Sequence, residues 1–337
     1  MNIRDIARLA KVTPGTVSKV LNNYPEISEA TRQHVMRIIE ANQYDPTVNL
    51  RTGKSSPAHT RVGIFLESVF NPLYSYMEHM ISRHAYNAGY TIFAFHDNFY
   101  QQDKWEKYQE LAAYAAANKL TALIYIGGNF GDLSAEQMDV LGCPAIFINT
   151  VLPLPADNAR YSSVQVNHYD AAFAQMGYLI RQGNREICTV ISSSIDNSVY
   201  GVRAEAYRAA LRRHGLEKNL EAFLESDYDG NKAYLAVSEY LAAHPDTTAV
   251  CSVTDYIVPG ILRAIHDAGR VPGRDVAVIS FDGTGGLEHC IPSVTTFEQP
   301  REDMVEFVSD LLFDLISGKR KHQHVIFQAK FVKGESC

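Results

Sequence analysis

The sequence contains no long apolar run and no paired cysteines. None of its apolar stretches approaches the length of a membrane-spanning helix, so the chain is not predicted to cross a bilayer. No apolar segment follows the charged first residues, so we expect no secretory signal peptide. The absence of any C-x-x-C spacing predicts free thiols in a reducing cytoplasm. The cysteines are Cys143, Cys188, Cys251, Cys290 and Cys337.

Motifs that are typical of enzymes are also missing. The sequence has no nucleophile elbow and no H-E-x-x-H metal motif. Residues 283–288 follow an apolar run, as a dinucleotide-binding loop would, but Glu288 replaces the third glycine of that fingerprint. His322 and His324 lie in a basic run that is typical of a solvated turn rather than of a metal site. We therefore expect no enzyme activity, no cofactor and no bound metal.

The charge of the chain is unevenly distributed. The 337 residues are enough for two or three domains, and their overall charge is −7. Residues 1–61 nevertheless carry nine basic and five acidic side chains, so the acidic excess lies entirely in the remainder. A basic N-terminal part on an acidic body is typical of a DNA-binding region that is joined to a regulatory domain.

Residues 1–45 are predicted to form three short helices. Apolar residues of the first helix recur at steps of three and four, at Ile3, Ile6, Ala7 and Ala10. Lys11 and Val12 form a tight turn, after which Thr13 is a good N-cap for the second helix. Ser28 caps the third helix. This pattern predicts a helix-turn-helix, although a plain three-helix bundle without a DNA role is the alternative.

A helix-turn-helix presents its second helix to the major groove of DNA. The outward-facing residues of that helix are small or form hydrogen bonds, which suits phosphates and base edges. The predicted DNA-binding residues in this domain are Thr13, Pro14, Gly15, Thr16, Ser18, Lys19, Asn22, Ser28 and Thr31. Because Pro14 and Gly15 have little reach, we expect base readout to depend on Thr13, Thr16 and Lys19.

The remaining sequence changes character twice. Residues 46–61 are rich in Pro, Gly, Ser and Thr and are predicted to be a linker. From residue 62 onward, short apolar runs alternate with amphipathic helical segments. The apolar runs cover 62–66, 91–95, 122–126, 145–148, 187–191, 249–253 and 276–280. Continuous apolar strands between helices predict an α/β fold whose parallel sheets are covered on both faces.

Motifs in both parts of the chain match a known family. They are Ile3–Val12, Thr16–Asn22, Ile27–Arg32, Tyr44–Pro46, Asn71–Tyr74, Tyr207–Leu211, Val271–Asp282 and Thr295–Pro300. On these motifs the chain resembles the LacI/GalR family of bacterial transcription repressors over essentially its whole length. The resemblance implies an N-terminal helix-turn-helix domain, then a doubly wound core of two subdomains like that of periplasmic binding proteins. It also implies a cytoplasmic homodimer on double-stranded operator DNA, with a tetramer left open.

The resemblance also implies domain boundaries. Residues 1–45 are the DNA-binding domain, 46–61 the hinge and 62–337 the core. The first subdomain covers about 62–161 and 293–323, and the second about 162–292 and 324–337. The connecting strands are expected near 161–163, near 291–293 and between 321 and 325.

The family hinge carries a leucine that inserts into the minor groove, and Leu50 matches it. We therefore count Leu50 among the DNA-binding residues. The segment 46–50 is shorter than the family pattern and lacks its Ala-Arg pair. Minor-groove insertion is therefore predicted to matter less here.

A small-molecule effector is expected in the cleft of the core. Ligands of open parallel sheets bind at the carboxyl ends of the strands, so residues that follow strands are candidates. By position or by resemblance, the predicted effector-binding residues are Phe70, Asn71, Tyr74, Asn149, Asn197, Arg203, Tyr228, Asp255 and Asp282. Aromatic faces among Asp, Asn and Arg side chains are typical of a carbohydrate site.

Several alternatives remain open at this stage. Arg203 and Asp255 could form a structural ion pair, Phe70 and Tyr74 could belong to the core, and Asp282 could cap a turn. The predicted function is a repressor that is controlled by a sugar-like effector. The alternatives are a solute-binding protein without a DNA role, a nucleotide-cofactor enzyme and a nucleobase-responsive regulator of the same fold.

Overall fold

The computed structural model describes residues 3–21, 27–41, 60–69, 71–96, 103–155, 159–193 and 198–337. The chain falls into two compact units, one of Met1–Arg61 with Ala85–Thr91 and the other of Val62–His84 with Ile92–Cys337. Among the described residues, no helix is both long and apolar enough to cross a membrane.

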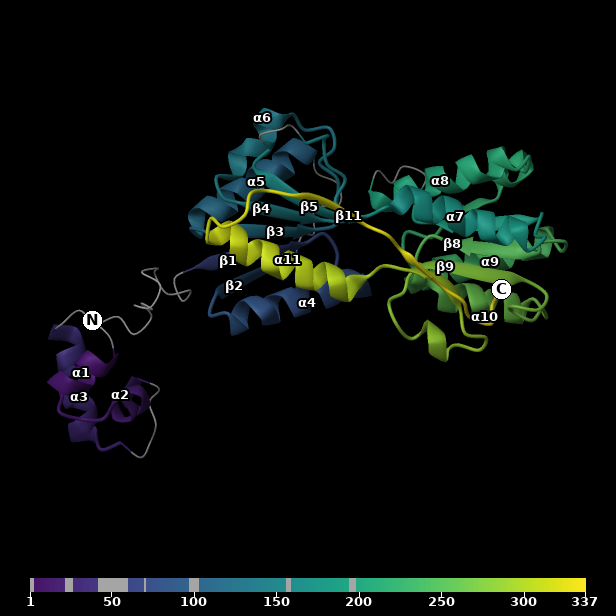
Figure 1. The fold of residues 1–337 in the computed structure, drawn as a ribbon. Coiled ribbons are helices and arrows are strands. Elements are labelled where there is room, and N and C mark those ends of the chain that lie inside the picture. The colour runs from purple at the N-terminus through teal and green to yellow at the C-terminus, as the bar shows by residue number, and fades with distance from the viewer. Residues whose placement is uncertain are drawn as a thin grey trace. The chain divides into compact units, whose positions relative to one another are not determined.

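The N-terminal unit contains the three predicted helices, α1 (Ile3–Leu9), α2 (Pro14–Leu21) and α3 (Glu29–Ala41), drawn in purple in Figure 1. Their apolar faces meet in one small core whose fully or nearly buried members are Ile6, Ala7, Ala10, Val17, Val20, Val35 and Ile39. Lys11 has the left-handed backbone angle φ 52°, which makes the turn between α1 and α2 tight. The sequence periodicity therefore predicted this domain correctly.

Two hydroxyls cap these helices as predicted. The Thr16 N–H donates to Thr13 Oγ1 at 3.1 Å, and the Thr31 N–H donates to Ser28 Oγ at 3.3 Å. Each bond satisfies a backbone donor at the first turn of a helix, which would otherwise have no partner within that helix.

The rest of the chain forms two α/β lobes, each built around one six-stranded sheet (Figure 1). The first sheet has the strand order β11-β5-β4-β3-β1-β2. Its strands are β1 (Arg61–Leu66), β2 (Thr91–His96), β3 (Ala122–Ile126), β4 (Ala145–Ile148), β5 (Tyr161–Val166) and β11 (His324–Phe327). The helices of this lobe are α4 (Pro72–Asn87), α5 (Lys104–Ala117), α6 (Ala135–Met138) and α11 (Arg301–Ile316), with the 3₁₀ helix η2 (Asp139–Leu141).

The second sheet has the order β12-β10-β9-β8-β6-β7, and only β12 pairs antiparallel among its defined registers. Its strands are β6 (Ile187–Ile191), β7 (Phe223–Glu225), β8 (Ala249–Ser252), β9 (Ala277–Asp282), β10 (Thr295–Glu298) and β12 (Lys330–Val332). Its helices are α7 (His168–Arg181), α8 (Val199–Arg213), α9 (Gly230–Ala243) and α10 (Val258–Asp267), with the 3₁₀ helices η3 (Glu217–Glu221), η4 (Asp255–Ile257) and η5 (Leu287–His289).

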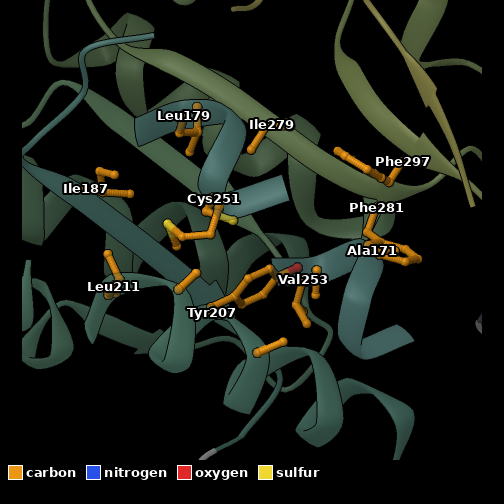
Figure 2. Close-up of a cluster of buried hydrophobic side chains, with 14 of the residues drawn as sticks. Ala171, Leu179, Ile187, Tyr207, Leu211, Cys251, Val253, Ile279, Phe281 and Phe297 are labelled. Carbon is orange, nitrogen blue, oxygen red and sulfur yellow. The ribbon is translucent and has the colours of Figure 1, made fainter. Parts of the chain in front are cut away.

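The second sheet is buried on both faces, which explains its continuous apolar strands. Successive residues point to opposite faces, so Cys251 packs under α7 and α8 while its neighbour Val250 packs under α9 and α10. Figure 2 shows the first of these clusters, in which Leu179 from α7 and Tyr207 from α8 lie against the strand residues. The predicted fold, an α/β core with parallel sheets, is confirmed.

The chain passes between the lobes three times, each time slightly later than the sequence suggested. Strand β5 belongs to the first sheet, so the first passage follows Val166 instead of Tyr161. Strand β10 belongs to the second sheet, which moves the second passage to the residues between β10 and α11. The third passage lies between β11 and β12. Strand pairing, which the sequence does not reveal, decides these boundaries.

The histidines of the basic run do not form the predicted solvated turn. His322 Nδ1 lies 3.0 Å from Ser162 Oγ, and His324 Nδ1 lies 2.9 Å from Ser163 Oγ. These bonds hold the edge strand β11 against the polar strand β5. Among the described residues, which include both histidines, no group of three metal-ligating side chains occurs.

Candidate effector cavity and DNA-binding helices

A cavity of about 1160 Å³ lies between the two lobes, at the carboxyl ends of β1, β6, β7 and β8. The first lobe lines it with Glu67, Ser68, Asn71 and Tyr74. The second lobe contributes Ser192, Ser193, Tyr200, Asp227, Tyr228, Asp229, Gly230, Asn231, Tyr234, Thr254, Tyr256, Pro259, Gly260, Arg263 and Asp267. Its location is the ligand position that parallel sheets favour.

Asn71 connects the two walls of the cavity. Its Oδ1 accepts from the N–H groups of Leu73 at 2.9 Å and Tyr74 at 3.2 Å, which caps α4. Its Nδ2 donates to the hydroxyl of Tyr200, a residue of α8 in the second lobe. Burial raises the pKa of both Tyr74 and Tyr200, so their hydroxyls stay protonated.

Tyrosine rings form much of the cavity surface in the second lobe. The rings of Tyr200 and Tyr228 meet edge to face, with centroids 4.8 Å apart. Tyr228 and Asp227 both have left-handed backbones, with φ 58° and φ 46°. Non-glycine residues adopt this conformation at a cost, and such positions concentrate at functional sites.

The described charged side chains of the lining are mostly acidic. Glu67 accepts from the Gly128 N–H at 2.6 Å, and Asp229 caps α9 through the N–H groups of Asn231 and Lys232. The single cation of the described lining, Arg263, is bound by Asp267 at 2.7 Å and 2.9 Å. With Asp227 as the fourth carboxylate, the described lining carries an excess of negative charge.

Four predicted effector-binding residues do not line this cavity: Asn149, Arg203, Asp255 and Asp282. Asn149, Arg203 and Asp282 are buried, and each forms hydrogen bonds with other buried side chains. Arg203 Nη2 donates to Asp282 Oδ1 at 2.8 Å, and Nη1 donates to the Val253 carbonyl at 2.7 Å. The ion pair considered for Arg203 therefore exists, but its acid is Asp282 rather than Asp255.

Asp255 is also buried rather than on the cavity surface. Its carboxylate accepts from the Thr284 N–H at 2.8 Å and from Thr296 Oγ1 at 3.1 Å. Burial and the nearby Asp282 carboxylate raise the pKa of Asp255 to about 7. Its flanking residues Thr254 and Tyr256 are the ones that reach the cavity.

The other five predicted effector-binding residues fall into two groups. Asn71, Tyr74 and Tyr228 lie on the cavity surface, whereas Phe70 and Asn197 lie outside the described residues. The sequence did not predict that Glu67 and the α10 pair Arg263 and Asp267 line the cavity. An Arg–Asp pair four residues apart is usually a solvated helix face, so it gave no signal.

Several of the predicted DNA-binding residues can be located in the N-terminal unit. Thr13, Lys19 and Ser28 are exposed, while Thr16 and Thr31 are partly buried. Thr13 Oγ1 and Thr16 Oγ1 lie 2.9 Å apart. Pro14, Gly15 and Ser18 belong to α2, but their side chains are not described, and Asn22 and Leu50 lie outside the described residues.

Comparisons with known proteins agree with this architecture. Residues 2–47 match the family model described as bacterial regulatory proteins of the lacI family, and residues 176–337 match a periplasmic binding protein-like domain. The transcriptional regulator MalR of Clostridium butyricum is 29% identical over 340 residues, which span 100% of this chain and 99% of MalR. The transcriptional repressor PurR of Erwinia tasmaniensis is 26% identical over 96% of this chain and 93% of its own length.

Solved structures share the fold at lower identity. The complex of the regulator CelR with cellobiose has a TM-score of 0.68 and 23% identity, and each chain is covered completely. The Lac repressor bound to ONPG has a TM-score of 0.71 and 21% identity, over 100% of this chain and 99% of that one. The chain therefore joins a region that matches the lacI family model to a periplasmic binding protein-like region, and over its whole length it is similar to bacterial transcriptional regulators.

Proposed function

We propose that this protein is a transcriptional repressor that binds operator DNA through its N-terminal helices and an uncharged sugar in the cavity between its lobes. The observation that carries the proposal is one chain that contains both a helix-turn-helix and a large, tyrosine-lined cavity at the strand ends. A ligand that prefers one state of the core changes DNA affinity by its difference in affinity for the two states.

The charge of the cavity selects the class of effector. A phosphate or carboxylate would lie among Glu67, Asp227, Asp229 and Asp267, and the one cation of the described lining, Arg263, is already paired with Asp267. A negatively charged ligand would be repelled by these carboxylates, and the repulsion is stronger where the ligand displaces water. Tyrosine faces and carboxylates instead suit the C–H faces and hydroxyl groups of an uncharged sugar.

The volume of the cavity favours more than one sugar ring. At about 1160 Å³ it lies slightly above the usual range for small-molecule sites, which ends at about 1000 Å³. Solved relatives are named as complexes with cellobiose, lactose and ribose, so the fold accommodates both one and two rings. We infer a disaccharide or a short oligosaccharide for this chain.

We further infer that the protein acts as a homodimer and binds its effector without converting it. Two copies bring two recognition helices to a near-palindromic operator, and a structure named as a Lac repressor dimer bound to operator shares this fold. Because its partner is chromosomal DNA, we place the protein in the bacterial cytoplasm.

Thermal unfolding of the full chain tests the effector class. Cellobiose, maltose and lactose are compared with glucose 6-phosphate and with hypoxanthine, because a ligand that binds the native state raises the melting temperature. We expect an uncharged disaccharide to raise it and glucose 6-phosphate to leave it unchanged. Stabilisation by hypoxanthine alone would replace this proposal with a nucleobase-responsive regulator.

The variant Tyr228→Ala tests the location of the effector. Losing the ring from the cavity surface should weaken the binding of the stabilising disaccharide about tenfold, as expected for roughly 1–1.5 kcal/mol of aromatic contact. The control is Tyr86→Ala, which removes an exposed ring that does not line the cavity. Calorimetric titration that gives equal affinities for Tyr228→Ala and the wild type would place the effector elsewhere.

A further inference from the structure

The cavity between the lobes continues onto the outer surface of the second lobe. Part of its lining belongs to α9 and α10, two helices that pack against the same face of the second sheet, in the green lobe of Figure 1. The residues of this part are here called the outer groove: Asn231, Tyr234, Pro259, Gly260, Arg263 and Asp267. All of them come from the second lobe, so the packing of α9 against α10 determines the shape of the outer groove.

The outer groove leads away from the carboxyl ends of the strands. Helix α10 connects β8 to the parallel strand β9, so it runs back along the sheet from the carboxyl edge. At about 1.5 Å per residue, the distance along this helix from Pro259 to Asp267 is about 12 Å. A ligand confined to the strand ends would therefore leave the outer groove empty.

Glycines keep the outer groove open where the two helices meet. A Cβ at Gly260 would lie 2.1 Å from the Gly230 carbonyl oxygen and 3.3 Å from the Tyr234 backbone nitrogen, so α9 and α10 meet there backbone to backbone. Both glycines line the cavity. Tyr234 and Arg263 lie about one turn further along their helices and therefore on the same faces as the two glycines. The result is a trough with a backbone floor between an aromatic ring and a guanidinium.

A hydrogen-bonded network joins the two helices at the outer groove. The Tyr234 hydroxyl on α9 donates to Asp267 Oδ2 on α10 at 3.1 Å. Arg263 Nε donates to the same carboxylate at 2.7 Å and 2.9 Å, and the Arg263 side chain remains 70% exposed. An ordinary ion pair on one helix has no partner on the next, whereas this one is also fixed to α9. The planar guanidinium and carboxylate therefore offer several donors and acceptors in a defined orientation.

The composition of the outer groove suits an uncharged sugar ring. A tyrosine ring can stack on the C–H face of a sugar, while the guanidinium and the carboxylate can pair with its hydroxyl groups. The charges of Arg263 and Asp267 cancel, so the outer groove carries no net charge. Because the outer groove and the cleft belong to one continuous cavity, a single chain of sugar rings can occupy both.

We propose that the outer groove is a separate sugar subsite, which binds the third ring of an oligosaccharide whose first two rings lie between the lobes. The preferred effector is then a trisaccharide or longer, and Tyr234, Arg263 and Asp267 select for chain length. This inference rests on the proposed function, since it needs an uncharged sugar in the cleft. It adds the length of that sugar and the residues that recognise its end.

Calorimetric titration of the full chain with sugars of matched linkage tests the length of the effector. The pairs are maltose with maltotriose, cellobiose with cellotriose, and lactose with galactosyllactose, so the members of each pair differ by one ring. In at least one pair we expect the trisaccharide to bind about tenfold more tightly, as contacts with one aromatic ring and one charged group would give.

The variant Arg263→Ala locates the third ring. It removes exposed donors of the outer groove and should lower the ratio of trisaccharide to disaccharide affinity about fivefold. The matched control is Arg274→Ala. Arg274 also donates from Nε to an aspartate on its own segment and its side chain is 73% exposed, but it does not line the cavity. The affinity ratio in Arg274→Ala should equal that of the wild type.

The variant Tyr234→Leu tests the aromatic contact separately. It keeps an apolar side chain against the core but removes the flat ring, so the affinity ratio should again fall. The control is Tyr240→Leu, since Tyr240 belongs to the same helix and packs against the same core without lining the cavity. Equal losses in Tyr234→Leu and Tyr240→Leu would indicate a general disturbance of α9 and would contradict the subsite.

Failure of this inference can be told apart from failure of the proposed function. Disaccharides that bind as tightly as their trisaccharides, or an affinity ratio that Arg263→Ala leaves unchanged, would overturn the subsite while an uncharged sugar remained the effector. If no member of the three pairs binds, the proposed function fails and the subsite fails with it.

Discussion

At the scale of the residue, Asp255 shows how the site keeps two carboxyl groups close together. Burial and the neighbouring Asp282 raise the pKa of Asp255 from its ordinary 3.8 to about 7. The folded chain then binds more protons than the unfolded chain between these values. Stability contributed by Asp255 is therefore lost as the pH rises through this range.

The variant Asp255→Asn should remove that loss. An asparagine can still accept from the Thr284 N–H and can donate to the Thr296 hydroxyl, so the site remains satisfied. We expect the free energy of unfolding of Asp255→Asn, relative to the wild type, to rise by roughly 2–3 kcal/mol between pH 5 and pH 8. Urea unfolding at both pH values measures it, and a difference that does not change with pH would show that Asp255 titrates normally.

A second prediction at this scale concerns the contribution of Lys19 to DNA binding. It is exposed on α2, so Lys19→Ala should weaken DNA binding and reduce the dependence of log affinity on log salt by about one phosphate contact. Fluorescence anisotropy over a salt series measures both effects. Asp5→Ala, which removes an ion pair with Arg8 on α1, serves as the control, and equal losses in both variants would indicate unfolding rather than lost contacts.

Sequence position predicted which residues lie near the cavity better than which of them face it. Asn71, Tyr74 and Tyr228 reach its surface, but Asn149 and Asp282 are buried and bind Gln299 and Arg203. Asn149 and Asp282 have positive φ angles, 47° and 117°, which redirect their side chains at the strand ends. A strand end identifies the edge of the sheet but not this backbone twist, so the sequence could not predict it.

At the scale of the element, the close approach of α9 and α10 depends on one glycine. A Cβ at Gly260 would lie 2.1 Å from the carbonyl oxygen of Gly230, a backbone atom that cannot move aside easily. Gly260→Ala should therefore lower the free energy of unfolding by about 1–3 kcal/mol, despite the helix propensity of alanine.

Gly230→Ala provides the matched control for this contact. Gly230 also lines the cavity and also belongs to a helix, but a Cβ there meets nothing within 4 Å. We expect a change below about 0.5 kcal/mol for Gly230→Ala, as is usual for substitutions without a clash. Equal destabilisation of the two variants in urea unfolding would contradict the packing described for α9 and α10.

Elements with continuous apolar runs were predictable, and polar or short ones were not. The runs at 122–126, 145–148 and 187–191 are strands β3, β4 and β6 with the predicted bounds. The resemblance placed a connecting strand near residues 161–163, and no apolar run indicated strand β5, whose pattern Ser162 and Ser163 interrupt. Their burial is possible because histidines near β11 bond to both hydroxyls, a pairing of segments far apart in the sequence.

At the scale of the whole molecule, charge separates the two tasks of the chain. Residues 1–61 are basic, which favours binding to DNA phosphates, while the rest of the chain is acidic. The cavity is also acidic, since its described lining has four carboxylates and one guanidinium. We therefore expect DNA phosphates to be attracted to the N-terminal part of the chain and an anionic ligand to be disfavoured in the cavity.

The central claim is that an uncharged sugar bound in the core controls binding of the N-terminal helices to DNA. The most direct measurement is the affinity of the full chain for a bacterial DNA fragment that it selects itself, determined by fluorescence anisotropy with and without sugars. At least one uncharged disaccharide should change this affinity tenfold or more, equivalent to about 1.4 kcal/mol of coupling, while glucose 6-phosphate should not. Selection of no specific fragment, or an affinity that responds only to glucose 6-phosphate or to hypoxanthine, would contradict the claim.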